Sequence, residues 1–475
     1  MSIETLTVDA YQLTTLVAHA DAGRLSQHLA MAFFLRKLPK QRNYVVFAGL
    51  RPILEHAAAM RISADELAAL ERHPLLGPAL AARPALVEAM RALDGFEGEI
   101  DALPDGTLVF AGPGLRTDGA PFTVAGTQVQ LYAPFLQVRT DMLRAKLIET
   151  PWLGRINSLS MVASKAARIV EAANGKAVLE FGARRTHPAA AVDATYAAYL
   201  AGTTASSNIA AGLKWGVPTT GTMDHFFVQA AERDDLGRAE SEREAFRAFY
   251  AAFPDSSTML VDTYDVWVGI RHAVEATGGR LTGIRLDSNV TPETAARARA
   301  LLDELGAPHA KILASDGLDE WRVRGLEPFC DGFGVGENIT CSPDAPVGVG
   351  AVAKVVVNGY GELTMKLARG SGKATLPGLL QVWRYADHDL VALADEATPA
   401  GGRPLLQPVW RGRAPVAELP SLEASRAEVR RQIAALPAPL RALEPAAAPR
   451  PMVASDGLVT VVEREVRAAG FDPHA

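Results

Sequence analysis

The sequence predicts an α/β protein, and a (β/α) barrel fits its strand count better than an open sheet does. The first observation is a series of seven short apolar segments, at 177–181, 217–221, 259–261, 283–286, 311–314, 332–335 and 353–357. The second is the amphipathic helical pattern between them, as at 242–252 and 292–305. Strands that alternate with helices in this way are typical of βα units in a parallel sheet. The sequence leaves open whether this sheet closes.

Residues 1–140 combine helical and strand patterns. Apolar residues recur at helical intervals over 14–35, and short apolar strands are expected at 44–48 and 107–110. The Ala- and Leu-rich stretch 65–93 predicts short helices, because Gly and Pro interrupt it. This part is therefore expected to form an N-terminal α/β domain.

A long helical pattern at 143–173 leads into the strand-helix alternation. We accordingly place a barrel domain at 141–375. The pattern loosens over 376–475, where the segment 436–451 is rich in Ala and Pro and is expected to be a linker or a surface wrap.

The composition is that of an ordinary globular protein, with 475 residues of which 48% are hydrophobic and 21% charged. The formal charge of -6 makes nucleic acid an unexpected partner. Two cysteines, Cys330 and Cys341, are too few for a disulfide framework, so they are expected to be small apolar residues in a reducing compartment. We find neither an apolar run of about 18 residues nor a signal-peptide pattern, and predict a cytoplasmic protein without a membrane partner.

Polar residues follow the predicted strands. They include Arg184, Arg185, Asp224, His225, Asp262, Asp265, Asp287, Ser315 and Asp316. In a parallel barrel, the carboxyl ends of the strands meet on one face, where such proteins place their active sites. Arginine forks bind phosphate, Gly-rich turns expose backbone N–H groups, and Asp binds Mg²⁺ through water. The pattern therefore predicts a site for a phosphorylated, metal-bound substrate, although each residue alone could be a helix cap or turn residue.

His225 is a candidate group-transfer residue, because it follows an apolar strand and neighbours Thr222 and Asp224. A structural hydrogen-bonding role is the alternative. The sequence contains no HExxH motif, P-loop or GxSxG elbow, so a zinc site is not expected and any ATP would bind without a Walker motif.

Fifteen short motifs, taken in order, resemble those of the ATP-coupled nicotinate phosphoribosyltransferases of NAD salvage. The motifs are DAYQLT at 9–14, FFLRK at 33–37, FAGL at 47–50, ET at 149–150, ASKAAR at 163–168, EFGARR at 180–185, SSN at 206–208, GTMDH at 221–225, DTYD at 262–265, RLDS at 285–288, SDGLDE at 315–320, FGVG at 333–336, KL at 366–367, GKATLPG at 372–378 and QVWR at 381–384. They span most of the chain.

The resemblance implies a type II phosphoribosyltransferase. Its fold would be an irregular (β/α) barrel with a second α/β domain, built from the N-terminal part and the C-terminal segment. It implies a homodimer that joins nicotinate and 5-phosphoribosyl 1-pyrophosphate to nicotinate mononucleotide and pyrophosphate, with coupled ATP hydrolysis and Mg²⁺.

The resemblance also implies roles for individual residues. His225 would be phosphorylated by ATP to a phosphohistidine, Tyr11 and Phe181 would stack on the pyridine ring, and Arg184 and Arg285 would lie near its carboxylate and the phosphates. Asp262 and Asp287 would hold ribose hydroxyls or Mg²⁺. The remaining binding residues would be Ser207, Ser315, Asp316, Gly317, Gly334, Gly336 and, less strongly, Lys373.

Two departures from the family pattern lie within or next to motifs that carry site residues, and a third, Thr203-Thr204-Ala205, replaces the more usual acidic or glycine-containing turn before Ser-Asn. Asn289-Val290 replaces the usual Gly-Asp after the RLDS motif, and Asp224 stands where a small residue is common. Three alternatives therefore remain: action on nicotinamide or another pyridine, a non-catalytic relative that binds a phosphorylated ligand, and an unrelated phosphosugar enzyme.

Overall fold

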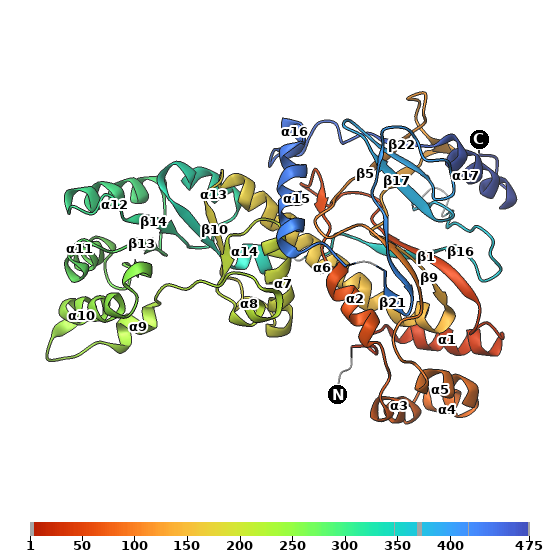
Figure 1. Cartoon of the computed structure of the whole chain (residues 1–475), viewed down its shortest axis with the longest axis horizontal. Helices are drawn as coiled ribbons and strands as arrows, with labels where there is room; N and C mark the ends of the chain where they lie inside the picture. Colours follow the sequence, from red (N-terminus) through yellow and green to blue (C-terminus); the bar gives the residue numbers. More distant parts are fainter. Residues whose placement is uncertain (1–3, 346, 368–372, 417, 474–475) are drawn as a thin grey trace. The chain divides into compact units, whose positions relative to one another are not determined.

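The computed structural model describes residues 4–345, 347–367, 373–416 and 418–473 (Figure 1). The chain divides into two compact units. Unit 1 comprises Met1–Met161 and Val347–Ala475, and unit 2 comprises Val162–Pro346. Strands and helices occur in both units, which confirms a mixed α/β protein. None of the helices within the described ranges is long and apolar enough to cross a bilayer.

Unit 2 is built on a six-stranded parallel sheet. Its strands are β10 (Ala177–Glu180), β11 (Ala205–Ser206), β12 (Thr258–Leu260), β13 (Gly283–Leu286), β14 (Lys311–Ala314) and β15 (Gly332–Val335). The strand order is β11-β10-β15-β14-β13-β12, and every pairing is parallel. All six carboxyl ends therefore lie along one edge. The sequence predicts five of these strands and misses the two-residue strand β11.

Helices connect the strands of unit 2, because a parallel pair needs a long crossover. They are α7 (Pro188–Leu200), α8 (Ile209–Trp215), α9 (His225–Ala230), α10 (Gly237–Ala252), η1 (Pro254–Ser256), α11 (Val266–Thr277), α12 (Pro292–Glu304), α13 (Glu320–Leu326), η2 (Glu327–Phe329) and α14 (Glu337–Thr340). Side chains of Asp224, Asp265, Thr291 and Asp319 cap α9, α11, α12 and α13 by accepting hydrogen bonds from first-turn N–H groups.

Two predicted barrel strands are wrong. The segment 217–221 forms only one parallel bridge, between Ser206 and Thr219, since Pro218 has no N–H to donate. The segment 353–357 lies in β16 (Val352–Val357), which pairs antiparallel with β1 (His28–Phe34) of unit 1.

Unit 1 contains the remaining strands. They are β2 (Val45–Val46), β3 (Gly98–Ala102), β4 (Leu108–Val109), β5 (Ala111–Leu115), β6 (Thr123–Val124), β7 (Thr127–Gln128), β8 (Gln130–Tyr132), β9 (Leu136–Asp141), β17 (Leu380–Arg384), β18 (Asp389–Leu393), β19 (Arg403–Pro404), β20 (Gln407–Gly412), β21 (Ala414–Pro415) and β22 (Met452–Ala454). Two six-stranded sheets have the orders β16-β1-β9-β3-β20-β21 and β19-β17-β18-β22-β5-β8.

The helices of unit 1 are mostly short. They are α1 (Ala10–Asp21), α2 (Leu50–Ala59), α3 (Ala64–Glu71), α4 (Gly77–Ala81), α5 (Pro84–Arg91), α15 (Leu422–Ala434), α16 (Ala438–Arg441) and α17 (Asp456–Ala468). Helix α6 (Met142–Ala172) includes residues of both units and confirms the long helix predicted at 143–173. The short helices expected within 65–93 are confirmed as well.

The helix expected at 14–35 is wrong in its second half. Helix α1 ends at Asp21, and Gly23 adopts a left-handed φ of +71° that a helix does not continue through. The following apolar run forms β1, in which all residues after His28 are buried between β9 and β16. Burial on both sides explains why its apolar residues do not alternate.

The Ala/Pro-rich segment 436–451 is a surface wrap rather than a loose linker. The side-chain amide of Asn43 donates hydrogen bonds to the carbonyls of Pro439, Ala442 and Glu444, at 3.3, 3.1 and 3.0 Å. Leu440, within α16, is buried.

The compact units divide the chain at 161/162 and at 346/347, whereas the sequence places domain limits at 140 and 375. The second difference has a physical reason, since β16 is paired within a sheet of unit 1. Whether 1–140, 141–375 and 376–475 behave as separate folding units stays a prediction.

Candidate functional site

A cavity of about 370 Å³ lies at the carboxyl edge of the unit 2 sheet. It is lined by Phe181, Ala183, Arg184, Arg185, Ser207, Gly221, Thr222, Asp224, Arg285, Asp287, Ser315, Asp316, Gly317, Leu318, Gly334, Gly336 and Glu337. Most of these residues stand on or directly after β10, β11, β13, β14 and β15. The parallel register thus brings together side chains that are far apart in the chain.

The carboxylate of Asp287 is at the centre of the polar contacts in this cavity. Its Oδ1 accepts a hydrogen bond from the Ser315 hydroxyl at 2.5 Å, and its Oδ2 accepts one from Arg285 Nη2 at 3.2 Å. Arg285 Nη1 also donates to the Thr222 hydroxyl at 3.0 Å. The guanidinium is therefore held in one orientation, with Asp287 as its ion-pair partner.

The carboxylate of Asp262 lies next to the backbone of Asp287. Its Oδ2 accepts a hydrogen bond from the backbone N–H of Asp287 at 3.0 Å. Its Oδ1 is buried and has no hydrogen-bond partner among the residues that the structure describes. A buried carboxylate oxygen without a donor is costly unless a cation or a ligand satisfies it.

His225 is the first residue of α9. Its Nδ1 lies 3.1 Å from the Thr263 hydroxyl, which orients the ring. Its Nε2 lies 3.7 Å from Asp287 Oδ2 and 3.9 Å from Asp262 Oδ1. The ring nitrogen that Thr263 leaves free thus faces the two carboxylates.

Asp224, one of the departures from the family pattern, has a local structural role. Its carboxylate accepts a hydrogen bond from the Phe227 N–H at 3.0 Å and so caps the N-terminus of α9. The negative charge next to His225 is compensated in part by this helix terminus.

Phe181 supplies a flat apolar wall, and the two glycines of the FGVG motif make room for it. A Cβ on Gly334 would lie 2.5 Å from the Phe181 ring, and one on Gly336 would lie 2.9 Å from the Phe181 carbonyl oxygen. Close packing of β15 against Phe181 is therefore a reason for these glycines besides the predicted approach to phosphate.

Buried Glu180 holds the turn that carries Phe181. Its Oε2 accepts hydrogen bonds from the hydroxyls of Thr195 and Ser206 at 2.9 and 2.6 Å. Its main-chain carbonyl accepts a hydrogen bond from the N–H of Ser207 at 3.0 Å, which places Ser207 at the cavity wall.

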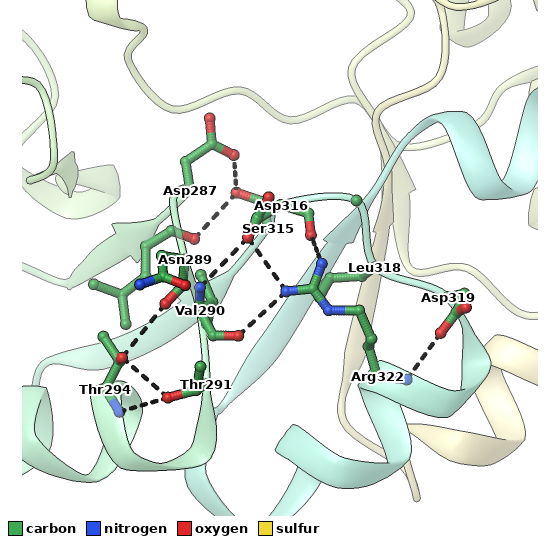
Figure 2. A network of polar contacts seen from close by, with 12 residues as sticks. Asp287, Asn289, Val290, Thr291, Thr294, Ser315, Asp316, Leu318, Asp319 and Arg322 are labelled. Atoms are coloured by element: carbon green, nitrogen blue, oxygen red, sulfur yellow. Dashed lines mark hydrogen bonds and ion pairs between the residues drawn. The ribbon is translucent and has the colours of Figure 1, made fainter.

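The turn after β14 has an unusual backbone. Asp316 has a φ of +119° and Gly317 a φ of +57°. Arg322 clamps this turn, since it donates to the Asp316 carbonyl, to Asp316 Oδ2 at 3.2 Å and to the Val290 carbonyl at 3.2 Å (Figure 2). Such strain persists only where surrounding contacts impose it.

The N–H groups of Asp316 and Gly317 donate to no acceptor within the described part of the chain. Consecutive free N–H groups at a positive-φ turn form an anion-binding nest.

Asn289, a second departure, also lies next to this turn. It has a φ of +50°, a left-handed conformation that Gly adopts freely and Asn tolerates better than most residues. Asn289 thus occupies a backbone conformation that is natural for the Gly it replaces.

Ten of the residues that the sequence predicts for the site line this cavity, and their binding roles stay predictions. These are Phe181, Arg184, Ser207, Arg285, Asp287, Ser315, Asp316, Gly317, Gly334 and Gly336. His225 and Asp262 contact this set through Asp287 without lining the cavity themselves. Thr222, Arg185 and Glu337 also line the cavity, and the sequence assigns them no binding role, although each follows a strand or a strand-like segment.

Tyr11 and Lys373 belong to unit 1 rather than to the cavity. Tyr11 lies in the first turn of α1, and partial burial together with Glu149 and Asp9 raises the pKa of its hydroxyl. Lys373 is exposed between β16 and β17, and Gly372 of the same motif lies outside the described residues. The roles of these two side chains stay predictions.

The two carboxylates are the best candidates for Mg²⁺ in this site. Among the residues that the structure describes there is no group of three or more His, Cys, Asp or Glu residues able to bind a metal directly. The unpartnered Oδ1 of Asp262 and the adjacent Asp287 nonetheless fit a hydrated divalent cation that also contacts substrate oxygens.

Comparison with known proteins identifies the family. The model of the nicotinate phosphoribosyltransferase N-terminal domain matches residues 6–157. The chain is 36% identical to the nicotinate phosphoribosyltransferase pncB2 of Mycobacterium tuberculosis, over 99% of this chain and 95% of that protein. It is 30% identical to the nicotinate phosphoribosyltransferase of Homo sapiens, over 85% of this chain and 82% of the human protein.

Solved structures agree with this result. The crystal structure of human nicotinic acid phosphoribosyltransferase superposes with a TM-score of 0.78 and 27% sequence identity, and the match covers 96% of this chain and 99% of the human chain. The resemblance found in the sequence motifs is thereby confirmed: the chain belongs to the nicotinate phosphoribosyltransferase family.

Proposed function

We propose that this protein joins nicotinate to 5-phosphoribosyl 1-pyrophosphate, with ATP hydrolysis, and releases nicotinate mononucleotide and pyrophosphate. Family membership supports the reaction. The observation that carries it chemically is the cavity lined by the Phe181 ring, Arg285 and the carboxylate of Asp287, with Asp262 next to Asp287.

Each part of the substrates has a matching surface in the cavity. The electron-poor pyridine ring would stack on Phe181, which is worth about 1 kcal/mol. Arg285 and Arg184 would attract its carboxylate and the phosphates. The nest at Asp316 and Gly317, with the Ser315 hydroxyl, would hold the 5′-phosphate.

Displacement of pyrophosphate at the anomeric carbon develops positive charge on the ribose and negative charge on the leaving group. Cationic groups near the leaving phosphates therefore matter more than a strong base. The pyridine nitrogen is already a nucleophile and requires no deprotonation. Asp262 and Asp287 would hold Mg²⁺ or ribose hydroxyls, and bound Mg²⁺ would neutralise charge on the leaving pyrophosphate.

We propose that His225 Nε2 accepts the γ-phosphoryl group of ATP, so that ADP leaves and a phosphohistidine forms. The nitrogen is available, because Nδ1 rather than Nε2 contacts Thr263. A phosphoryl group placed there would approach Asp287 and Asp262, and the resulting repulsion would need Mg²⁺ or an arginine to offset it. Phosphorylation could thereby organise the subsite for Mg²⁺ and pyrophosphate.

Replacement of His225 by Ala is expected to abolish stimulation by ATP and to leave slow, uncoupled transfer. Initial rates with and without ATP, together with ³²P incorporation from labelled ATP, would measure both effects. His309→Ala is the matched control, since His309 is exposed and lies outside the cavity. If ATP still stimulates the His225→Ala variant, another residue carries the phosphoryl group.

The site also supports the finer fold prediction, an irregular (β/α) barrel. In hydrogen-bonding order the named strands of this sheet end at β11 and β12, and one bridge adds the segment 217–221 beside β11. Side chains cross between those ends, because His225 contacts Thr263 and Arg285 contacts Thr222. We propose that these contacts close the curled sheet in place of backbone pairing.

A homodimer is the proposed assembly. Unit 2 exposes large apolar side chains at Ile209, Leu213, Phe226, Phe253 and Val268, and Leu213 is 85% exposed. Ile209 and Leu213 lie four residues apart on α8 and so share one helix face, and an exposed apolar face of this kind favours association. Sedimentation of the purified chain is expected to give a dimer mass, and a monomer at micromolar concentration would contradict the proposal. The cytoplasmic location and the lack of a nucleic-acid partner stay predictions.

The proposed activity is tested by product formation with 5-phosphoribosyl 1-pyrophosphate and Mg²⁺, comparing nicotinate with nicotinamide, each with and without ATP. Nicotinate mononucleotide formed faster with ATP is the expected result. Preference for nicotinamide would instead favour the alternative substrate. Ligand binding without turnover, in protein shown to be folded, would indicate a non-catalytic relative.

A further inference from the structure

A second cavity, of about 250 Å³, lies in unit 1 among residues of β4, β17, β19 and α15. Four of its lining residues are arginines: Arg384, Arg403, Arg431 and Arg450. Arg384 is the last residue of the QVWR motif. The proposed transferase reaction assigns no role to this motif. Arginines gathered around one cavity are an anion-binding feature unless internal carboxylates balance them.

The inner pair, Arg384 and Arg450, is rigid, and one buried carboxylate balances it in part. Arg384 and Arg450 share the fully buried carboxylate of Asp389, with N–O distances of 2.7 and 3.1 Å. Both guanidinium groups lie over the ring of Phe110, at 5.1 and 5.3 Å from its centroid. Gln432 fixes Arg384 further, since its side-chain oxygen accepts a hydrogen bond from Nη1 at 3.2 Å.

The outer pair consists of Arg403 and Arg431, and the carboxylate of Glu428 neutralises only part of its positive charge. Arg431 forms two hydrogen bonds with the carboxylate of Glu428, at 2.6 and 2.7 Å. Arg403 approaches that same carboxylate only to 3.7 Å, and no hydrogen bond from its guanidinium is found within the described residues. Its side chain is 51% exposed.

The electrostatic surroundings of Arg403 are unfavourable for a cation. Partial burial lowers the pKa of the Arg403 guanidinium, and the positive charges of Arg384 and Arg431 lower it as well. The negative charge of Glu428 raises this pKa but does not cancel the other effects. Taken together, four guanidinium groups face the two carboxylates of Asp389 and Glu428. The cavity thus has an excess of two positive charges.

We propose that this cavity binds a phosphate monoester that carries a planar ring, such as a nucleoside 5′-monophosphate. A phosphate monoester has a charge of about -1.5 to -2 at neutral pH, which matches the excess of two. Its oxygens would bind the free donors of Arg403 and the outer edge of Arg431. The ring would lie against the apolar lining supplied by Tyr385 and Leu436.

This site is separate from the cavity of unit 2, because the two share no lining residue. The proposal therefore does not rest on the transferase activity, and loss of one site should leave the other intact.

Equilibrium dialysis of the full chain with labelled AMP, and separately with labelled inorganic phosphate, tests the proposal. We expect one class of AMP sites to be weakened at least tenfold in the double variant Arg403→Gln/Arg431→Gln, and AMP to bind this class at least tenfold more tightly than inorganic phosphate. The single variant Arg403→Gln should show part of the loss. It should also fold, since no described hydrogen bond depends on that side chain.

The matched control is Arg464→Gln/Arg467→Gln on α17, which removes the same two charges from exposed positions of unit 1. Its AMP binding is expected to equal that of the wild type. Unchanged AMP binding in the double variant at Arg403 and Arg431, or an equal loss in the control, would overturn the site. Equal affinity for AMP and inorganic phosphate would overturn the monoester assignment.

Discussion

Replacement of Asp287 by Ala is expected to lower kcat/KM at least about 30-fold, which corresponds to about 2 kcal/mol of transition-state stabilisation. The carboxylate accepts hydrogen bonds from Ser315 and Arg285, and its oxygen lies 3.7 Å from His225. The variant removes the acceptor that orients Arg285 and one of the two candidate ligands for Mg²⁺. Steady-state kinetics with varied 5-phosphoribosyl 1-pyrophosphate measures the effect.

Two further variants make this result specific. Asp287→Asn retains an acceptor and removes the charge, so a loss close to that of Ala would assign the effect to the negative charge. Asp303→Ala is the control, because Asp303 is half exposed on α12 and its nearest ion partner, Arg299, lies 3.7 Å away. A near-normal rate of Asp287→Ala would contradict the role proposed for this carboxylate.

Replacement of Glu320 by Gln is expected to destabilise the protein by about 3–5 kcal/mol, the usual cost of breaking a buried ion pair on one side. Glu320 is 1% exposed, and its carboxylate lies 2.6 Å from Lys165 Nζ and 2.8 Å from Arg168 Nε. The variant would leave two buried cations with Asp344 as the remaining carboxylate near Lys165. Denaturant unfolding, with Glu304→Gln on the surface of α12 as control, measures the loss.

The same carboxylate should make stability depend on pH. Burial raises the pKa of Glu320, but the ion pairs with Lys165 and Arg168 outweigh burial and bring the pKa below its ordinary value. The stabilisation is therefore complete above the unfolded value of about 4.3 and is lost as the pH falls through the lower folded value. In the Gln variant this part of the acid sensitivity should be absent, and an unchanged acid profile would contradict the assignment.

The candidate site was predictable because its residues follow a local rule. Phe181, Asp287, Ser315 and Gly334 each stand in or just after a short apolar strand, and the carboxyl ends of parallel strands share one edge. The order of the motifs along the chain also indicates the family, and the comparisons with known proteins confirm it.

Other features depend on partners that a local pattern does not contain. The apolar run 353–357 resembles a barrel strand. It is part of β16, however, and β16 pairs antiparallel with β1, which pairs on its other side with β9 in a sheet of unit 1. The run 28–34 resembles part of a helix for the same reason, since burial on both sides removes the alternation that identifies strands.

The sequence alone predicts the α/β class, the five strands β10, β12, β13, β14 and β15, the family and most of the residues around the unit 2 cavity. These properties are encoded locally, in apolar periodicity, strand-end chemistry and motif order. Three features follow from tertiary packing alone: His225 Nε2 faces Asp262 and Asp287, Gly334 makes room for Phe181, and Arg403 lacks a close partner among the described residues. Distances between side chains of different elements result from packing of the whole chain, which residue patterns along one segment do not specify.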